Sequence, residues 1–210
     1  MTTTQAAPLF IALEGGDGAG KSTQAELLRD WLESRGREVV LTREPGGTDL
    51  GRTLRREVLH GEDLDPRTEA LLYAADRAHH VHTLVRPALA RGAVVVTDRY
   101  IDSSVAYQGA GRGLGHDEIR ELSAWATGGL LPDLTVVLDL DAATAAARRS
   151  GEPDRLEREP SAFHEEVRAS FLALAAAEPA RYAVVDASLA PQDVHREVRA
   201  RLTPLLEESR

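Results

Sequence analysis

The sequence predicts an α/β protein in which one parallel, five-stranded sheet is flanked by helices. Five short apolar runs rich in Val, Leu and Ile recur along the chain, and they are near-continuously apolar, as strands buried on both faces are. Longer segments with helical periodicity separate the runs, and this alternation is typical of a parallel sheet. A glycine-rich loop directly after the first run indicates a ligand site at the carboxyl edge of that sheet.

The predicted elements alternate along the chain. The first strand, 9–13, precedes a helix at 22–35 with apolar residues at helical spacing, and Gly36 ends that helix. A long helix at 68–90 contains Pro87, which is expected to kink it or to begin a new turn. The remaining strands are 39–42, 93–97, 134–140 and 182–185, and the remaining helices are 50–59, 117–127, 142–149, 161–177 and 191–206.

Length and charge limit the possible functions. The 210 residues fit one domain, predicted to span 1–210 with residues 1–8 flexible. With 25 basic and 34 acidic residues the formal charge is −9, so no broad positive field for nucleic acid or anionic membranes is expected. The chain has no cysteine, which excludes disulfides and thiolate chemistry. Since it also shows no secretory signal or long apolar stretch, we expect a cytoplasmic protein without membrane or nucleic-acid partners.

Residues 15–22 read GGDGAGKS and fit the pattern G-x-x-x-x-G-K-[ST] between a predicted strand and a predicted helix. Glycines let the backbone curl so that N–H groups face phosphate oxygens, and the helix adds the positive end of its dipole. This context argues against a chance glycine-rich turn and predicts a three-layer P-loop NTPase fold that binds a nucleoside triphosphate, which the resemblance described below makes ATP. The ATP-binding residues expected here are Gly15, Gly16, Asp17, Gly18, Ala19, Gly20, Lys21, Ser22 and Thr23.

Lys21 is the one lysine among 25 basic residues, so the other 24 are arginines. A compact ammonium fits between phosphates where a planar guanidinium would crowd the loop. The use of lysine at position 21, where this chain otherwise uses arginine, therefore supports a phosphate-binding role for Lys21. It also excludes the N-K-x-D motif with which GTP-binding switch proteins read guanine, because no second lysine remains.

Further short motifs follow in order: TREPGG at 42–47, a tyrosine and an arginine at 73 and 77, DRY at 98–100, AYQG at 106–109 and an arginine-rich segment before Ser161. In order and spacing they resemble the thymidylate kinase family over nearly the whole chain. The resemblance implies transfer of the γ-phosphoryl group of ATP to dTMP, which supplies dTTP synthesis, by a homodimer that uses Mg²⁺.

The resemblance also assigns an acceptor site. Tyr73 would stack on thymine, and Arg77, four residues further on the same helix face, would donate to its carbonyl. Ser104 and Tyr107 match positions that touch the base edge and exclude a 2′-hydroxyl, while Asp17 would contact the 3′-hydroxyl. On the residues alone, a core tyrosine and a solvated arginine are the alternative. The full set of expected dTMP contacts is Asp17, Arg43, Pro45, Tyr73, Arg77, Arg99, Ser104, Tyr107 and Gln108.

Asp98 and Arg99 end the strand beside the phosphate loop. A carboxylate there can hold Mg²⁺ or its water shell together with Ser22, and Arg99 can clamp the acceptor phosphate. A plain surface ion pair is the alternative for such a pair standing alone. The nucleophile is a phosphate oxygen that is already largely dianionic at neutral pH, so no general base is assigned.

Residues 148–160 are predicted to form an arginine-rich lid. Some relatives carry an arginine inside the phosphate loop, where this chain has Gly18, and the missing charge is expected from Arg148, Arg149, Arg155 and Arg158. This resembles the bacterial subtype whose lid arginines close over ATP; a mobile solvated loop is the alternative. The expected catalytic residues are Asp17, Lys21, Arg99, Arg149 and Arg155. Arg148, Arg149 and Asp186 complete the expected ATP site.

His79, His80 and His82 lie near Asp76 on the long helix, but no third element offers metal-ligand spacing. Polar surface or interface histidines are therefore expected, and this helix is the candidate dimer contact.

Two other functions stay open on the residues alone. Another nucleoside or nucleoside monophosphate kinase could use this scaffold, although Arg77, Tyr107 and the TREPGG loop favour thymidylate. A P-loop switch or motor ATPase acting through partners belongs to a different class, and the missing N-K-x-D motif and ABC-type signature argue against it.

Overall fold

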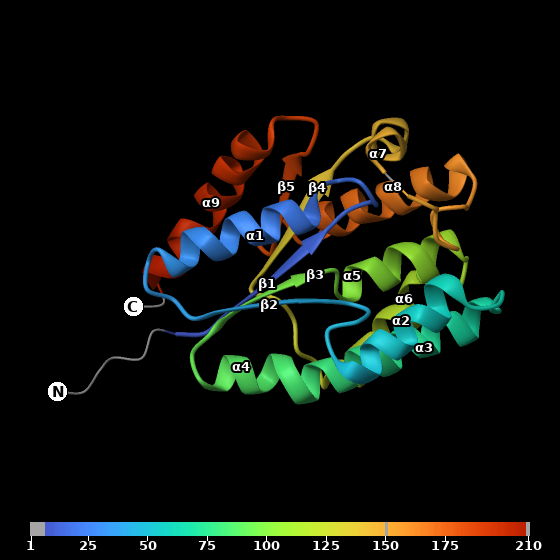
Figure 1. The fold of residues 1–210 in the computed structure, drawn as a ribbon, viewed down its shortest axis with the longest axis horizontal. Helices are drawn as coiled ribbons and strands as arrows, with labels where there is room; N and C mark the ends of the chain where they lie inside the picture. The colour runs from blue at the N-terminus through green and yellow to red at the C-terminus, as the bar shows by residue number, and fades with distance from the viewer. Residues whose placement is uncertain (1–6, 150, 209–210) are drawn as a thin grey trace.

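The computed structural model describes residues 7–149 and 151–208. In this part of the chain five parallel strands form one sheet in the order β2-β3-β1-β4-β5, with helices on both faces (Figure 1). The predicted three-layer P-loop NTPase architecture is confirmed. The strands are β1 (Leu9–Glu14), β2 (Val39–Arg43), β3 (Val94–Asp98), β4 (Leu134–Asp139) and β5 (Tyr182–Asp186).

The strand register brings the sequence motifs together. β1 lies between β3 and β4, with Leu13 opposite Asp98 and Glu14 opposite Val137. On the other side of β3, Arg43 of β2 is also opposite Asp98. The loops that follow β1, β2 and β3 therefore leave the sheet at the same edge, as expected for parallel strands.

Two apolar cores form because side chains alternate across the sheet. Leu9, Ile11 and Leu13 of β1 face the core under α1 (Lys21–Glu33) and α9 (Pro191–Glu208). Phe10 and Ala12 face the opposite core, which contains residues of the other helices except α7 (Ala142–Arg148), whose Ala145 belongs to the first core. Figure 1 shows α1 and α9 together on one side of the sheet. The remaining helices are α2 (Asp49–His60), α3 (Pro66–His80), α4 (Arg86–Ala90), α5 (Ile101–Ser104), α6 (His116–Thr127) and α8 (Ser161–Ala177).

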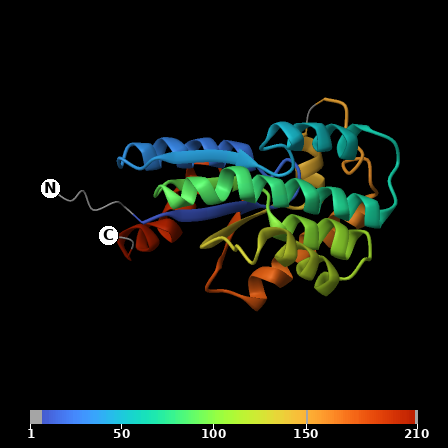
Figure 2. The same ribbon diagram turned by 90° about the horizontal axis from the view of Figure 1, so that it is seen from below.

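The predicted long helix is continuous but changes its winding. A π-helical segment, η1 (Val81–Val85), joins α3 to α4, and Pro87 is the second residue of α4. Wider winding before a proline accommodates a residue that cannot donate its i−4 hydrogen bond. Seen from below, α3, η1 and α4 run along one side of the molecule, with α2 and α6 beside them (Figure 2).

Residues 101–111 are helical, although the sequence predicted no helix or strand between 98 and 116. Residues up to Gly111 continue a helix, because α5 is followed by a second π-helical segment, η2 (Val105–Gly111). This winding buries Tyr107 and Gln108 instead of leaving them in a loop.

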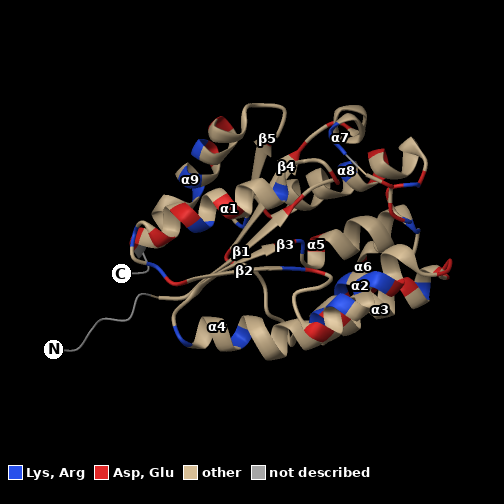
Figure 3. Ribbon diagram, viewed as in Figure 1, with Lys and Arg blue, Asp and Glu red and all other residues tan. Residues whose placement is uncertain are grey.

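The ends of the chain and the charged surface complete the description. Residues 1–6 of the segment predicted to be flexible lie outside the described residues, and the Ala7 carbonyl accepts a hydrogen bond from Arg37. Acidic and basic residues are interspersed along α1, α2 and α9 (Figure 3). Across residues 7–149 and 151–208, no helix has the length and apolar character needed to span a membrane.

Candidate active site

The loop between β1 and α1 is shaped by glycines that approach neighbouring backbone. Gly15 has φ +132°, and a Cβ there would lie 2.5 Å from the Leu138 carbonyl oxygen; Gly18 has φ +89°, and a Cβ would lie 2.4 Å from the Ala145 carbonyl oxygen. A larger residue at either position would collide with backbone that cannot move aside. The loop conformation is therefore tied to β4 and α7.

Lys21 is buried within this loop. Its Nζ donates to the carbonyl oxygens of Gly15 at 3.0 Å and Gly16 at 2.8 Å. Burial and the neighbouring charge of Arg99 lower the pKa of Lys21. The ammonium group is thus held inside the loop by the backbone.

Ser22 and Asp98 lie together at the mouth of the loop. The Ser22 hydroxyl donates to Asp98 Oδ2 at 2.9 Å, and both residues line the cavity around the phosphate loop. Mg²⁺ bound with a nucleotide needs one or two protein oxygen ligands of this kind, the rest coming from water and phosphate. The donor set therefore fits Mg²⁺. Elsewhere in the described part of the chain, no group of three or more His, Cys, Asp or Glu side chains is placed to hold a metal.

Asp17, Arg99 and Tyr107 form a second cluster beside the loop. Arg99 Nη2 pairs with Asp17 Oδ1 at 2.5 Å, and the Tyr107 hydroxyl donates to Asp17 Oδ2 at 3.1 Å. Burial alone would raise the pKa of Asp17, but the charges of Arg99 and Lys21 outweigh it and hold the pKa below its ordinary value. Asp17 is therefore ionised at neutral pH.

The backbone at Arg99 is unusual, and a carboxylate holds the turn. Arg99 has φ +73°, a region that non-glycine residues seldom adopt. Glu14, at the end of β1, accepts hydrogen bonds from the backbone N–H of Tyr100 at 2.8 Å and from the Ser103 hydroxyl at 2.6 Å. Burial raises the pKa of Glu14. The turn that presents Arg99 is thus fixed from β1, and nothing in the local sequence indicates this role for Glu14.

A cavity next to this cluster is lined by most of the predicted acceptor residues. Tyr73 and Arg77 of α3 face it from one side, and Tyr107 and Gln108 of η2 face it from the other. Asp17, Pro45, Arg99 and Ser104 also line it. These residues come from five separate segments of the chain, and the fold brings them to one cavity. The lining residues that were not among the expected dTMP contacts are Glu44, Arg55, Leu59, Tyr100, Ser103, Asp154 and Leu156.

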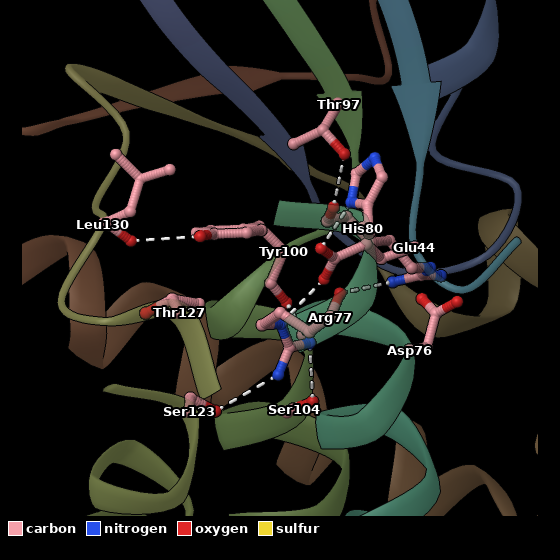
Figure 4. Close-up of polar contacts among 12 residues, drawn as sticks. Glu44, Asp76, Arg77, His80, Thr97, Tyr100, Ser104, Ser123, Thr127 and Leu130 are labelled. Carbon is pink, nitrogen blue, oxygen red and sulfur yellow. Dashed lines mark hydrogen bonds and ion pairs between the residues drawn. The ribbon is translucent and has the colours of Figure 1, made fainter. Parts of the chain in front are cut away.

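Arg77 lines this cavity and is buried among polar partners, with 2% of its side chain exposed (Figure 4). Its Nε pairs with Glu44 Oε2 at 2.7 Å, its Nη1 donates to Ser123 at 3.2 Å, and its Nη2 donates to the Tyr100 carbonyl and to Ser104. A guanidinium has five N–H donors, so one Nη1 hydrogen has no acceptor among the described residues. The alternative of a solvated helix arginine does not apply to Arg77.

Glu44 also binds His80. The His80 ring lies 2.8 Å from Glu44 through Nδ1 and 2.6 Å from the Thr42 hydroxyl through Nε2, and its side chain is fully buried. The expectation of a surface or interface histidine is therefore wrong for His80, because its two partners come from β2 and the loop after it. The neighbouring Asp76 is also buried, and its Oδ2 lacks a hydrogen bond.

The cations nearer the phosphate loop are more accessible. Arg43 is exposed and lines the phosphate-loop cavity. Arg55 of α2 lines both cavities and donates to the Pro45 carbonyl at 3.1 Å. Arg55 was not singled out in the sequence, because an arginine on an amphipathic helix is normally solvated; its position beneath the TREPGG turn only follows from the packing of α2.

The predicted lid arginines do not all reach the phosphate loop. Arg148 lines the phosphate-loop cavity and donates to the Ala187 carbonyl at 2.8 Å, whereas Arg149 lines a separate cavity behind the loop. Arg155 is buried against α2 and α3 and lines neither the acceptor cavity nor the phosphate-loop cavity. Arg158 is exposed and donates to the Pro153 carbonyl. Ser150, within the predicted lid, lies outside the described residues.

The far end of the phosphate-loop cavity is apolar. Ala187, Leu189, Pro191 and Val194 line it beside Gln24. Asp186 is turned away into a local hydrogen bond with the backbone N–H of Ser188 at 2.8 Å. A weakly polar surface of this kind fits an adenine base, and Ala187 lines it whereas Asp186 does not.

Comparison with known proteins agrees with this geometry. The sequence model of the family described as thymidylate kinase matches residues 13–198. The chain is 63% identical to a thymidylate kinase of Clavibacter sepedonicus, over 94% of this chain and 96% of that protein. It is 50% identical to a thymidylate kinase of Gloeobacter violaceus, over 96% and 97%. The crystal structure of thymidylate kinase from Ehrlichia chaffeensis matches with a TM-score of 0.78 and 33% identity, covering 93% of this chain and 99% of that one. The chain therefore belongs to the thymidylate kinase family.

Proposed function

We propose that this protein transfers the γ-phosphoryl group of ATP to dTMP. The observation that carries the proposal is the junction of two cavities: the phosphate-loop cavity and the acceptor cavity share Asp17, Glu44, Arg55 and Arg99. A donor phosphate held by the loop and an acceptor phosphate held by Arg99 would meet at this junction. Transfer between two such phosphates is catalysed mainly by positioning and by cancelling charge.

The acceptor cavity suits a thymine base and a deoxyribose. Tyr73 supplies an aromatic face for stacking, and the remaining Nη1 hydrogen of Arg77 can be donated to a base carbonyl. The buried Tyr107 ring closes the cavity beside Asp17, which supports exclusion of a 2′-hydroxyl. Ser104 holds Arg77 in place in addition to any contact with the base edge.

Three arginines are positioned to bind the acceptor phosphate. Arg99 lies over the Tyr107 ring at 5.0 Å and pairs with Asp17, while Arg43 and Arg55 border the phosphate-loop cavity nearby. When a phosphate enters, the guanidinium of Arg99 can share its donors between that phosphate and Asp17. Since the attacking oxygen is already largely ionised, no side chain needs to remove a proton from it.

The donor triphosphate would be bound by the backbone N–H groups of residues 15–23 and by Lys21. Mg²⁺, when bound, would neutralise charge on the β and γ phosphates, and Ser22 and Asp98 are the residues that would hold it. We assign Arg148 and Arg149 to the closing segment, because their positions flank the loop. Closure over the triphosphate would also exclude water.

A coupled assay tests the proposal. ADP release is measured with ATP, Mg²⁺ and one of dTMP, dUMP, dGMP, AMP or thymidine. We expect dTMP to give the highest kcat/KM. If dTMP does not raise ADP release above background, the proposal is wrong; if another nucleoside monophosphate is preferred, the scaffold serves a different kinase.

We also propose assembly as a homodimer. Leu71 of α3 and Trp125 of α6 are 58% and 83% exposed, and their two helices pack against each other. Large exposed apolar side chains on adjacent helices are typical of an interface. Light scattering should give twice the mass of the chain, and Trp125→Glu should shift the mass toward the monomer. A monomeric wild-type protein would contradict this proposal.

A further inference from the structure

Arg155 lies in the segment between α7 and α8 that the sequence assigned to the lid over ATP, yet its side chain is directed elsewhere. Its Nη1 pairs with the Glu69 carboxylate of α3 at 2.6 Å, and its Nε donates to the Val58 carbonyl at 2.9 Å. The backbone N–H of Arg155 donates to the Leu59 carbonyl at 3.1 Å. With 6% of the Arg155 side chain exposed, this is a buried anchor on α2 and α3.

Glu69 is the centre of the anchor and is fully buried. It also accepts a hydrogen bond from Gln108 Nε2 at 2.8 Å. A second ion pair, at 3.3 Å, joins Glu69 to Arg112, the residue directly after η2. Arg112 in turn pairs with Glu159 at 2.6 Å, so the segment is attached at two points. The formal charges of these four side chains, two arginines and two glutamates, sum to zero. Pairing of this kind lets a protein bury charged groups.

The residues on either side of Arg155 form a wall of the acceptor cavity. Asp154 and Leu156 line that cavity together with Tyr73 and Gln108. The turn is rigid, because Asp154 Oδ1 accepts hydrogen bonds from the backbone N–H groups of Leu156 and Glu157, each at 2.9 Å. Glu69 is therefore bonded to two sides of the cavity, η2 through Gln108 and this turn through Arg155, and it lies one turn before Tyr73 on α3.

We propose that Glu69 and Arg155 are positioning residues of the acceptor site, whose buried ion pair holds residues 154–156 as the outer wall of the dTMP cavity. The proposal rests on the proposed function. It gives Arg155 a task on the acceptor side, in place of a contact with ATP. A residue that positions one substrate affects mainly the KM for that substrate, whereas a residue that contacts the transferring group affects mainly kcat.

Steady-state kinetics of Arg155→Ala separate the two roles. We expect the KM for dTMP to rise about tenfold or more, while kcat and the KM for ATP stay within about threefold. Arg181→Ala is the matched control, because Arg181 also forms an ion pair, with Glu178 at 3.0 Å, and lines neither nucleotide cavity. A tenfold loss of kcat with an unchanged KM for dTMP would overturn the proposal and would favour a contact between Arg155 and ATP.

A second pair of variants guards against a simple folding defect. Glu69→Gln and Arg155→Lys keep the size and much of the bonding of the pair. We expect dTMP to raise the melting temperature of Glu69→Gln by less than it raises that of the wild type, while the shift caused by ATP is retained. Equal dTMP shifts in variant and wild type would mean a merely structural pair and would also overturn the proposal.

Coupling between the two residues provides the final check. If both act through one ion pair, the double variant Glu69→Gln/Arg155→Ala should raise the KM for dTMP no further than the more severe single variant. If the increases in the KM for dTMP of the two single variants multiply in the double variant, the two residues do not act through one ion pair. An inactive wild type toward dTMP would instead refute the proposed function, so the two failures are distinguishable.

Discussion

The acceptor and donor halves of the active site hold their charged side chains in different ways. In the acceptor half Arg77 and Glu44 are both about 2% exposed and are bonded to each other and to neighbouring side chains. In the donor half Arg148 is exposed at the rim, and the buried Lys21 is held by backbone carbonyls. The charged side chains of the acceptor half are thus fixed by one another, whereas in the proposed function the arginines of the donor half would rearrange around a triphosphate.

This difference has an energetic consequence. Breaking one member of a buried charge pair leaves the other uncompensated, so acceptor-half variants should lose both stability and binding. Exposed cations contribute little to stability, so donor-half variants should change catalysis with a normal melting temperature. The predictions below test this contrast, from the largest expected effect to the smallest.

Lys21→Arg should have the largest effect on turnover. The guanidinium keeps the charge but cannot take the position of the ammonium between the carbonyls of Gly15 and Gly16. We expect kcat to fall by about 10²–10³, as when a preorganised transition-state donor is lost, with dTMP binding within about threefold. Stopped-time ADP assays and dTMP titration measure the two quantities. Full activity would show that the single lysine is incidental.

Glu44→Gln should be the most damaging change to the acceptor half. It leaves the buried Arg77 without its charge partner, so we expect about 3–5 kcal/mol loss in unfolding free energy, the range for a broken buried pair. Discrimination between dTMP and dCMP should also weaken, because Arg77 would no longer be held to read the carbonyl. Denaturant unfolding and kcat/KM ratios measure both effects. If the preference for dTMP over dCMP is unchanged, Glu44 has no role in base recognition.

Arg149→Ala sharpens the contrast with Arg155→Ala. Arg149 lies behind the phosphate loop and donates weakly to the Glu157 carbonyl at 3.4 Å. We expect a fall in kcat of about tenfold, with the KM for dTMP and the melting temperature close to wild type. Arg149→Ala should therefore change mainly kcat, whereas Arg155→Ala should change mainly the KM for dTMP. If both raise the KM for dTMP, the closing segment acts as one unit on the acceptor side.

Asp76→Asn should have the smallest effect and should appear only in the pH dependence of stability. Burial and the charge of Glu44 raise the pKa of Asp76 from 3.8 to about 6. The folded state therefore binds more protons than the unfolded state between these values, and its contribution to unfolding free energy decreases as pH rises from about 4 to 6. Melting curves of the wild type and the variant should diverge over this range, the variant being favoured at higher pH. Parallel curves would contradict the assignment.

Local patterns predicted much of the molecule because the relevant interactions are short in sequence. The strand and helix alternation follows from hydrophobic periodicity, and the phosphate loop needs only its glycines, Lys21 and the flanking elements. The helix over 101–111 escaped prediction, since its π-helical winding and its glycines do not show an ordinary 3.6-residue period. Likewise, the helical spacing around His80 gave no sign that a carboxylate 36 residues earlier would bury it.

By itself the sequence determined the fold class, the phosphate loop with its single lysine, and the residues from which an acceptor site could be built. Only the tertiary structure decided which way the long charged side chains point. Arginine reaches several ångströms and can pair with a carboxylate from any element packed nearby, so its direction depends on the whole fold. For this reason Arg77 faces Glu44, and Arg155, which the sequence placed over ATP, faces Glu69.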